Sequence, residues 1–364
     1  MTAAWLVAAR RTAVMPRGGA FARLGLADLA TPVIAACLAD AGIAPGAVDE
    51  LVLSNALGAG GNPARLVALA AGLPETVAGV TLDRQCAGGL DALLIARALI
   101  LAGQADVVLA GGVESYSRRP LRLRTDPDGG PALAYDQPPF TPWPDRDPPM
   151  VMAAEALAQA LGITRAKQDD WVVASHAKAM AAGAGPEIVA LPQGSADGFA
   201  RALTPALAAR ARVLAGSITA ANAAVAADGA AFGLVVSDRV ARNLPRALRL
   251  AAGATLGGRP EEPGLAPVAA IARALTQAGL AASDLALAEV MEAYAVQAIA
   301  CVQGAGLDPA RVNTGGGALA RGHPVGASGA VLAVRLFHDL QAGYGLATIA
   351  AAGGIGTALV LQAE

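Results

Sequence analysis

The sequence predicts an α/β protein with two duplicated halves and an inserted loop domain, and three observations support this. Short apolar runs alternate with longer segments whose apolar residues recur at helical spacing. ADVVLAGGVES (residues 105–115) and LATIAAAGGIG (346–356) both run from an apolar strand into paired glycines. This echo favours an internal duplication, and convergence on a common strand pattern is the alternative. Between residues 116 and 222 the alternation gives way to a proline-rich stretch followed by alanine-rich sequence, which predicts the insertion.

Composition limits the classes of function. The chain has 364 residues, of which 55% are hydrophobic and 15% charged, with a net charge of -2, so it can bury a large core. The balanced charge leaves no basic face for nucleic acid. Three cysteines are too few and too widely spaced for a disulfide framework, which indicates a reducing, cytoplasmic location. Arg10 and Arg11 follow the first apolar run instead of preceding it, so we expect no export signal.

The first half is expected to alternate strands and helices. The predicted elements are a strand at residues 5–8, a helix at 26–41, a strand at 50–54, a helix at 63–71 and a strand at 105–112. Before the last of these strands, the segment 77–103 reads as a strand, a tight turn at residues 86–89 and a long apolar helix.

The α/β alternation resumes after helical sequence at residues 152–182. Strands are predicted at 232–237 and 285–290, and helices at 267–278, after Met291 and after the glycine loop 315–329. The charge-free run 340–363 is long enough to span a bilayer, but its glycines divide it into two pieces around a turn. We therefore expect a buried strand pair and no membrane span.

The common signatures of phosphate and metal chemistry are missing from the sequence. Lys167 and Lys178 are the only lysines, so no GxxxxGK phosphate loop is present. The three histidines, His176, His323 and His338, form no HExxH pair, and no metal site is expected.

Cys86 is the candidate nucleophile. It stands in DRQCAGG, where a strand ends and a long helix begins, so backbone N–H groups at the helix N-terminus should favour its thiolate. The adjacent glycines permit close approach by a substrate. Cys37 and Cys301 lie in apolar helical sequence and are expected to be buried without chemical function.

His323 is the candidate activating base. It lies in RGHPVGASG, where small neighbours would let the ring reach a cleft, and an imidazole is the usual activator of a cysteine nucleophile. His176 and His338 lie on predicted helices and are expected to be surface or packing residues.

Several sequence blocks resemble those of the thiolase family. They are DRQCAGGLDAL, GGVES, EVMEAYAVQ, NTGGGALARGHPVGASGA and GLATIAAAGGIG, which occur in the family's order along nearly the whole chain. AARRTAV, NPARLVALAAGLP and AADGAA agree as well.

The resemblance implies the thiolase fold, in which two similar halves form a layered αβαβα core and an inserted loop domain covers coenzyme A. The corresponding limits are residues 1–115 plus 223–243 for the N-terminal half, 116–222 for the loop domain and 244–364 for the C-terminal half. It also implies an acyl-CoA thioester as substrate, no bound cofactor, and assembly as a homodimer or tetramer.

The resemblance assigns the chemistry to four backbone or side-chain groups. Cys86 would attack the acyl-CoA thioester and His323 would activate it. The backbone N–H groups of Cys86 and Ala352 would bind the oxyanion.

This chain departs from the family in the machinery for the second substrate. Ala350 stands where the family has a second cysteine that acts as a base, and Met291 stands where an asparagine helps to hold a water in an oxyanion hole. A methionine thioether cannot donate a hydrogen bond. Glu292 is kept and is the candidate substitute base.

Two substrate-binding positions differ as well. Ala224 stands where the family has a serine near pantetheine, and Pro149 precedes Met150 where an HMG block is usual. The stretch 187–217 is short for the family, so a partner protein could complete the acyl-CoA site.

We therefore expect an acyltransferase of lipid metabolism that forms acyl-Cys86 and is inefficient in thiolysis. The acceptor could be a carbon nucleophile made by decarboxylation, an amine, hydroxyl or external thiol, or a group deprotonated by another base such as Glu292. The alternative is a catalytically silent acyl-CoA-binding or scaffold subunit that works with a partner.

Overall fold

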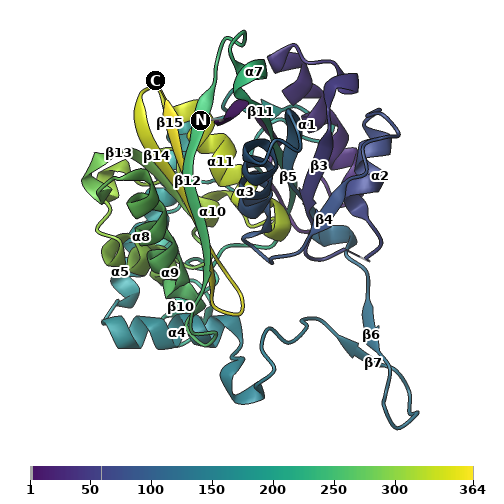
Figure 1. Ribbon diagram of the computed structural model, residues 1–364. Helices are drawn as coiled ribbons and strands as arrows, with labels where there is room; N and C mark the ends of the chain where they lie inside the picture. Colours follow the sequence, from purple (N-terminus) through teal and green to yellow (C-terminus); the bar gives the residue numbers. More distant parts are fainter. Residues whose placement is uncertain (1–2, 59, 364) are drawn as a thin grey trace.

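One long mixed sheet organises the protein. The computed structural model describes residues 3–58 and 60–363 (Figure 1). Its main strands lie in the order β13-β14-β15-β12-β1-β11-β5-β3-β4. Their bounds are β1 Ala4–Thr12, β3 Glu50–Ser54, β4 Val80–Leu82, β5 Val107–Ser115, β11 Ala227–Ser237, β12 Leu248–Gly257, β13 Leu285–Val290, β14 Gly343–Ala351 and β15 Ile355–Ala363.

The two halves of this sheet have the same topology. In the first half, β1 is antiparallel to β11, β11 is antiparallel to β5, and β5 is parallel to β3. In the second half, β12 is antiparallel to β15, β15 is antiparallel to β14, and β14 is parallel to β13. The halves join where β1 pairs with β12. This repeat confirms the predicted duplication, whereas the strand β12 was missed by the sequence analysis.

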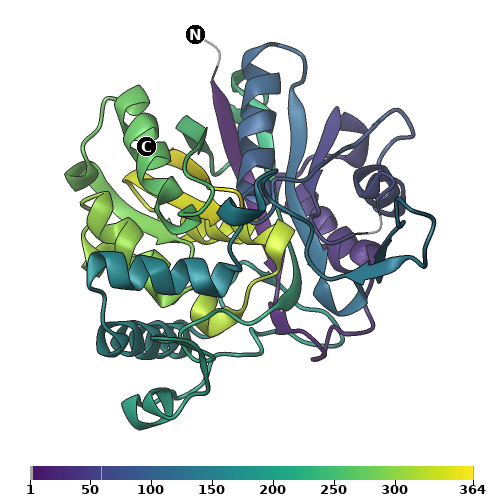
Figure 2. The same cartoon turned by 90° about the horizontal axis from the view of Figure 1, so that it is seen from below.

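Helices lie on both faces of the strands and between the halves. The central layer contains α3 (Gly88–Leu101) and α11 (Ser328–Asp339), which pack against each other and against strands of both halves. Helices α1 (Leu26–Ala41) and α2 (Pro63–Ala70) cover the other face of the first half, and α8 (Ala266–Ala278) covers that of the second. Figure 2 shows the resulting αβαβα layers from below.

Alternation along the strands divides their side chains between these layers. In β3, Leu51 and Leu53 pack against α1 and α2, whereas Val52 packs in the central cluster with α3. Successive side chains of a strand point to opposite faces, so one short apolar strand contributes to two cores.

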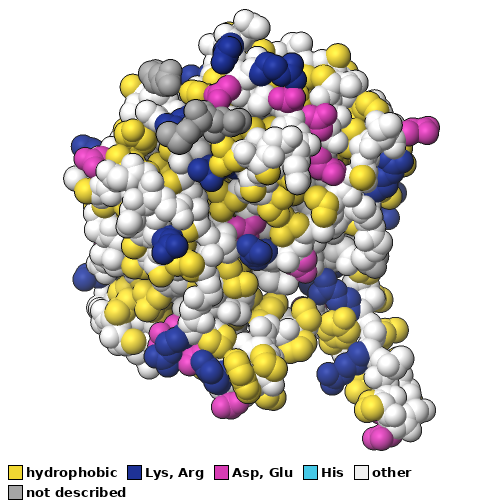
Figure 3. Space-filling model, in the orientation of Figure 1, with side chains coloured by type: hydrophobic (Ala, Val, Ile, Leu, Met, Phe, Trp, Pro, Cys, Tyr) yellow, Lys and Arg dark blue, Asp and Glu magenta, His cyan; other side chains and the backbone are white. Residues whose placement is uncertain are grey.

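The chain between β5 and β11 forms a large insertion. Its counterpart in the second half is the turn between β14 and β15. The insertion contains β6 (Arg122–Arg124), β7 (Leu133–Tyr135), α4 (Met150–Leu161), α5 (Arg165–Ala182), β8 (Ile188–Val189), α6 (Pro205–Ala209), β9 (Val213–Ala215) and β10 (Ile218–Thr219). The hairpin β6–β7 projects from the body of the protein (Figures 1 and 3). The predicted division at residues 115, 222 and 243 stays a prediction.

Residues 152–182 are helical, as predicted, and form two helices separated by a break that the sequence analysis did not predict. Gly162 adopts φ +62° and ends α4, and α5 begins at Arg165. A glycine in the left-handed region is a common helix stop.

The remaining elements complete the connections. They are β2 (Met15–Pro16), α7 (Asp238–Ala241), α9 (Ala295–Gly304) and α10 (Ala318–Arg321). The apolar run 340–363 forms β14 and β15, as predicted. Within the described residues, no helix combines the length and apolar character needed to cross a membrane.

Two glycines let α3 and α11 touch at their first turns. A Cβ atom on Gly89 would lie 2.7 Å from the backbone nitrogen of Ala330, and one on Gly329 would lie 2.4 Å from that of Leu90. Neither contact leaves room for a side chain. The first turns of the two helices are therefore held together, and the residues just before them, Cys86 and His323, become neighbours.

We expect Gly329→Ala to destabilise the protein by about 1–3 kcal/mol, because the new methyl group would overpack the helix contact. Denaturant unfolding at neutral pH measures the change. Gly46→Ala is the matched control, since nothing lies within 4 Å of a Cβ at Gly46, and its effect should stay within about 0.5 kcal/mol. Equal stability of the two variants would contradict the proposed role of the helix contact.

Candidate functional site

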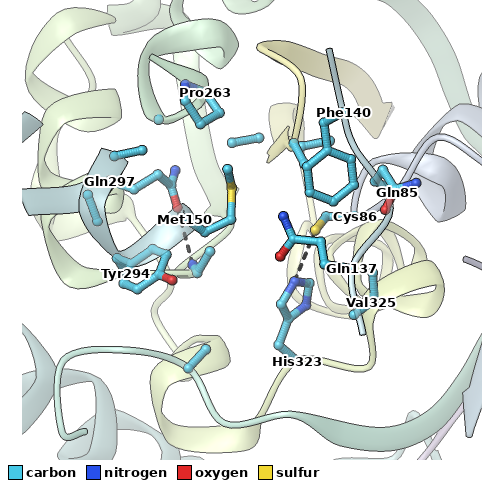
Figure 4. A pocket seen from close by; sticks show the side chains of 18 of the residues that line it. Gln85, Cys86, Gln137, Phe140, Met150, Pro263, Tyr294, Gln297, His323 and Val325 are labelled. Carbon is cyan, nitrogen blue, oxygen red and sulfur yellow. Dashed lines mark hydrogen bonds between the residues drawn. The ribbon is translucent and has the colours of Figure 1, made fainter. Parts of the chain in front are cut away.

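Cys86 and His323 form a hydrogen-bonded pair (Figure 4). The Nε2 atom of His323 lies 3.1 Å from the Sγ atom of Cys86. Cys86 comes two residues before α3, in a turn where Gln85 has φ +50°, and His323 lies between α10 and α11. The structure therefore brings together the two residues that the sequence analysis selected from opposite halves of the chain.

Ser328 orients the imidazole of His323 through the ring nitrogen that faces away from Cys86. Its Oγ atom lies 2.6 Å from Nδ1 of His323. If Nδ1–H donates to the hydroxyl, Nε2 carries a free lone pair toward the thiol of Cys86, which is the arrangement a general base requires. Ser328, the first residue of α11, thus holds the ring of His323 in place.

Both members of the pair are neutral at physiological pH. Burial raises the pKa of Cys86 to about 12 and lowers the pKa of His323 to about 4. The backbone N–H group of Cys86 favours the thiolate, as expected at the start of a helix, but the cost of desolvating the charged sulfur outweighs it. The carboxyl of Glu114 raises the pKa of Cys86 further.

The pair opens into a cavity of about 250 Å³. Four other residues singled out from the sequence line it, namely Met150, Ala224, Ala350 and Ala352. The remaining wall is largely apolar, with Leu57, Pro138, Phe140, Ala153, Ala154, Leu157, Pro263, Ala293, Val325 and Ala351. Such a mostly apolar hollow with a few polar groups is typical of a site for a small organic substrate.

Polar side chains gather at two places on this wall. Tyr116, Arg119, Arg122 and Asp136 come from the start of the insertion, and Arg119 bonds Asp136 at 2.6 Å. Tyr294 and Gln297 lie at the start of α9. Sequence analysis missed both groups; Tyr294 and Gln297 fall within the block EVMEAYAVQ, which is the one signal that could have indicated them.

The structure does not bring Met291 or Glu292 to this cavity. Met291 is buried in the central core and lines a separate small cavity with Ser328. The Glu292 carboxylate accepts hydrogen bonds from Trp171, Ser175, Asn313 and the backbone of Leu319, at 2.7–3.1 Å. It is a structural anchor between elements, so its candidacy as substitute base has no support in the geometry.

A buried ion network supports the loop that carries His323. Arg321 bonds Asp197 at 3.2 Å and also donates to the backbone oxygens of Gly315 and Gly316. Asp197 accepts from Arg11 at 2.7 Å, and these two guanidinium groups help to lower the pKa of Asp197 to about 2. The strand β1 and the insertion therefore hold the glycine loop through residues that do not line the cavity.

The other cysteines and histidines are packing residues. Cys37 and Cys301 are buried, which raises the pKa of each thiol to about 12. His176 is buried and accepts from the backbone of Arg201, and His338 lies 2.8 Å from the Ala9 carbonyl oxygen. In the part of the chain that is described, no cluster of side chains could hold a metal ion.

Comparisons with known proteins agree along the whole chain. Residues 4–239 match the family description "Thiolase, N-terminal domain", and residues 245–363 match "Thiolase, C-terminal domain". An acetyl-CoA acetyltransferase of Pseudomonas aeruginosa is 39% identical over 388 residues, covering 99% of each chain. One of Cupriavidus necator is 37% identical over 397 residues, covering 100% of each chain.

Solved structures show the same fold. Human mitochondrial 3-ketoacyl-CoA thiolase in complex with CoA has a TM-score of 0.93 at 30% identity and covers 100% of this chain and 98% of its own. The acetyl-CoA acetyltransferase of Bacillus anthracis has a TM-score of 0.92 at 32% identity, covering 100% and 99%. With both domain matches, the full-length relatives and the layered duplicated core in agreement, this chain belongs to the thiolase family.

Proposed function

We propose that the protein is an acyltransferase that takes an acyl group from coenzyme A onto the sulfur of Cys86. The 3.1 Å contact between Cys86 and His323 at the wall of the cavity carries this proposal. His323 accepts the thiol proton as the sulfur attacks the thioester carbonyl, and the same proton then goes to the departing CoA sulfur. Because both groups are neutral before the attack, the site does not have to stabilise a thiolate before the substrate binds.

The oxyanion that develops on the acyl oxygen needs donors fixed in advance. The backbone N–H groups of Cys86 and Ala352 are the proposed ones. Ala352 follows β14 and lines the cavity together with Cys86, and within the described residues its N–H donates no other hydrogen bond. Such a donor typically contributes about 10²–10³ in rate.

We expect coenzyme A to bind at the cavity as a substrate and not as a bound cofactor. The relatives are named for acetyl-CoA, and one solved neighbour holds CoA. Met150 and Ala224 line the apolar passage, and the guanidinium groups of Arg119 and Arg122 at the insertion side suit phosphate groups. The acyl chain would extend past Met150.

We do not expect the protein to catalyse thiolysis efficiently. Ala350 lines the cavity and its methyl group cannot deprotonate an incoming thiol. A missing general base costs about 10²–10⁴ in rate. The open acceptors are a carbon nucleophile formed by decarboxylation, or an amine, hydroxyl or external thiol that needs no base at residue 350.

A silent acyl-CoA-binding subunit is the second candidate. The replacements at Met291 and Ala350 favour it, because both remove groups that act on the second substrate. The hydrogen-bonded Cys86 and His323 weigh against it, since scaffolding needs neither group. A cytoplasmic location, a homodimer or tetramer, and a partner protein that completes the site stay predictions.

Incubation with acetyl-, malonyl- and medium-chain acyl-CoA should add the corresponding acyl mass to Cys86. Intact-protein mass spectrometry measures this, and the gain should vanish in Cys86→Ala but persist in the control Cys301→Ala. His323→Ala should slow the acylation by about 10²–10⁴, because it removes the base. Binding of acyl-CoA without any labelling would favour the scaffold candidate.

The acylation rate should be independent of pH between about 5.5 and 9. With the pKa of His323 near 4, the free base is present above that value and is lost as the pH falls through it. With the pKa of Cys86 near 12, thiolate does not form until strongly alkaline pH. Stopped-flow or quench-flow acylation across this range tests the expectation, and a step in the rate within it would show that one of the two groups titrates there, contrary to these pKa values.

Ala350→Cys should raise thiolytic activity by about 10²-fold or more, since it restores a group that can deprotonate the acceptor thiol. Release of acetyl-CoA from acetoacetyl-CoA and CoA is the assay. Ala350→Ser is the matched control, because it adds a polar atom of similar size without an acidic thiol. If the serine variant gains as much as the cysteine variant, the missing thiol is not what limits thiolysis.

A further inference from the structure

Tyr294 places a hydroxyl in the cavity on the wall across from Cys86 and His323 (Figure 4). It is the residue immediately before α9. The close-up shows its hydroxyl directed toward the space between the two walls. A ligand of Cys86 must occupy that space.

The backbone around Tyr294 is held on both sides, so the ring has a defined place. The carbonyl of Ala293 accepts from Ala224 and the N–H of Ala295 donates to Asn222, both at 2.9 Å. The N–H of Ala293 donates to the side-chain oxygen of Gln297 at 3.2 Å. The ring itself packs against the cluster formed by α4 and α9.

The hydroxyl of Tyr294 is free to bind a ligand. Among the described residues it makes no hydrogen bond. Burial, with a smaller contribution from the nearby Cys86 sulfur, raises the pKa of Tyr294 to about 12, so the phenol stays protonated and acts as a donor. It can therefore hold a developing negative charge but cannot serve as a base at neutral pH.

The acceptor groups near the pair are bound by other residues. The Gln297 oxygen binds Ala293, whereas its amide nitrogen is buried without a hydrogen-bond partner. The Glu114 carboxylate accepts from Asn55 and from the backbone of Ala56, Leu57 and Gly326. Asp136, the carboxylate that lines the cavity, is bound to Arg119 and largely exposed. Gln85 and Gln137 line the cavity as well, but a neutral amide is not a base. Among the described residues, then, no second base free of an ion pair lines the cavity, whereas the Tyr294 hydroxyl offers a protonated donor on the wall facing the pair.

We propose that Tyr294 is a catalytic residue of the acceptor step, and that the acceptor is a thioester enolate formed by decarboxylation. This inference rests on the proposed acyl-Cys86 intermediate. The backbone donors of Cys86 and Ala352 serve the oxygen of the acyl group, so a second oxygen needs its own donor. Tyr294 donates a hydrogen bond to that oxygen, which belongs to the incoming thioester. Loss of CO₂ supplies the electron pair, so no base is needed.

The acceptor step begins with decarboxylation. The C–C bond to the malonyl carboxylate breaks, CO₂ leaves, and the electrons of that bond form the enolate, whose oxygen accepts a hydrogen bond from Tyr294. The enolate carbon attacks the acyl carbonyl on Cys86, a new C–C bond forms, and the C–S bond to Cys86 breaks. The thiolate takes one proton from the solvent through His323, which returns the neutral pair.

Single-turnover transfer tests the proposal in the full-length protein. Acetyl-Cys86 is formed from acetyl-CoA, excess donor is removed, and malonyl-CoA or fresh acetyl-CoA is added. Malonyl-CoA should discharge the enzyme to acetoacetyl-CoA, and acetyl-CoA should not. Tyr294→Phe should acylate within about twofold of wild type but transfer to malonyl-CoA about 10²–10³ more slowly, as expected for a lost oxyanion donor.

Controls separate the possible failures. Tyr344→Phe removes a hydroxyl from the outer end of β14 and should behave as wild type in both steps. Equal transfer rates in wild type and Tyr294→Phe would overturn the role of Tyr294, and equal discharge by acetyl-CoA would overturn the decarboxylative acceptor. Absence of acetyl-Cys86 in the wild type would overturn the proposed function itself, which the mass spectrum reports before any acceptor is added.

Discussion

Two helices of the central layer meet at their first turns, where Gly89 and Gly329 leave no space for a side chain. These helices, α3 and α11, occupy equivalent places in the two halves. Helix α3 leads into β5, which is parallel to β3, and α11 leads into β14, which is parallel to β13. The residues before them are Cys86 and His323. A duplicated fold whose halves pack through their central helices thus creates one site from two loops that are far apart in the sequence.

Burial sets the chemistry of that site. Desolvation favours the neutral forms of the thiol and of the imidazole. In the proposed reaction, charge develops only when the thiol attacks a carbonyl, near the backbone N–H groups of Cys86 and Ala352. Preorganised donors act most strongly where little water competes with them, because they need not reorient as the charge appears.

The sequence alone predicted the duplicated fold and the Cys86–His323 pair, because glycines and chemically distinctive residues mark both loops. It missed β12, whose alanines and glycines give a weak strand signal, and the helix break at Gly162. The net rise in the pKa of Cys86 was not predicted, since desolvation depends on chain segments from both halves. Glu292 looked available because its partners Trp171, Ser175 and Asn313 come from distant segments that no local pattern connects to it.

Two departures from the family pattern concern the second substrate. Met291 and Ala350 belong to the second half, near the start of α9 and the end of β14, and Tyr294 immediately precedes α9. The distance from Cys86 to His323 is fixed elsewhere, by the glycine contact and by the ion network under the His323 loop. Substitutions on the α9 and β14 wall can therefore change what the acyl group is transferred to without disturbing how it is loaded. A cavity that keeps its nucleophile and its base, loses a thiol and presents a neutral phenol is suited to an acceptor that brings its own electron pair.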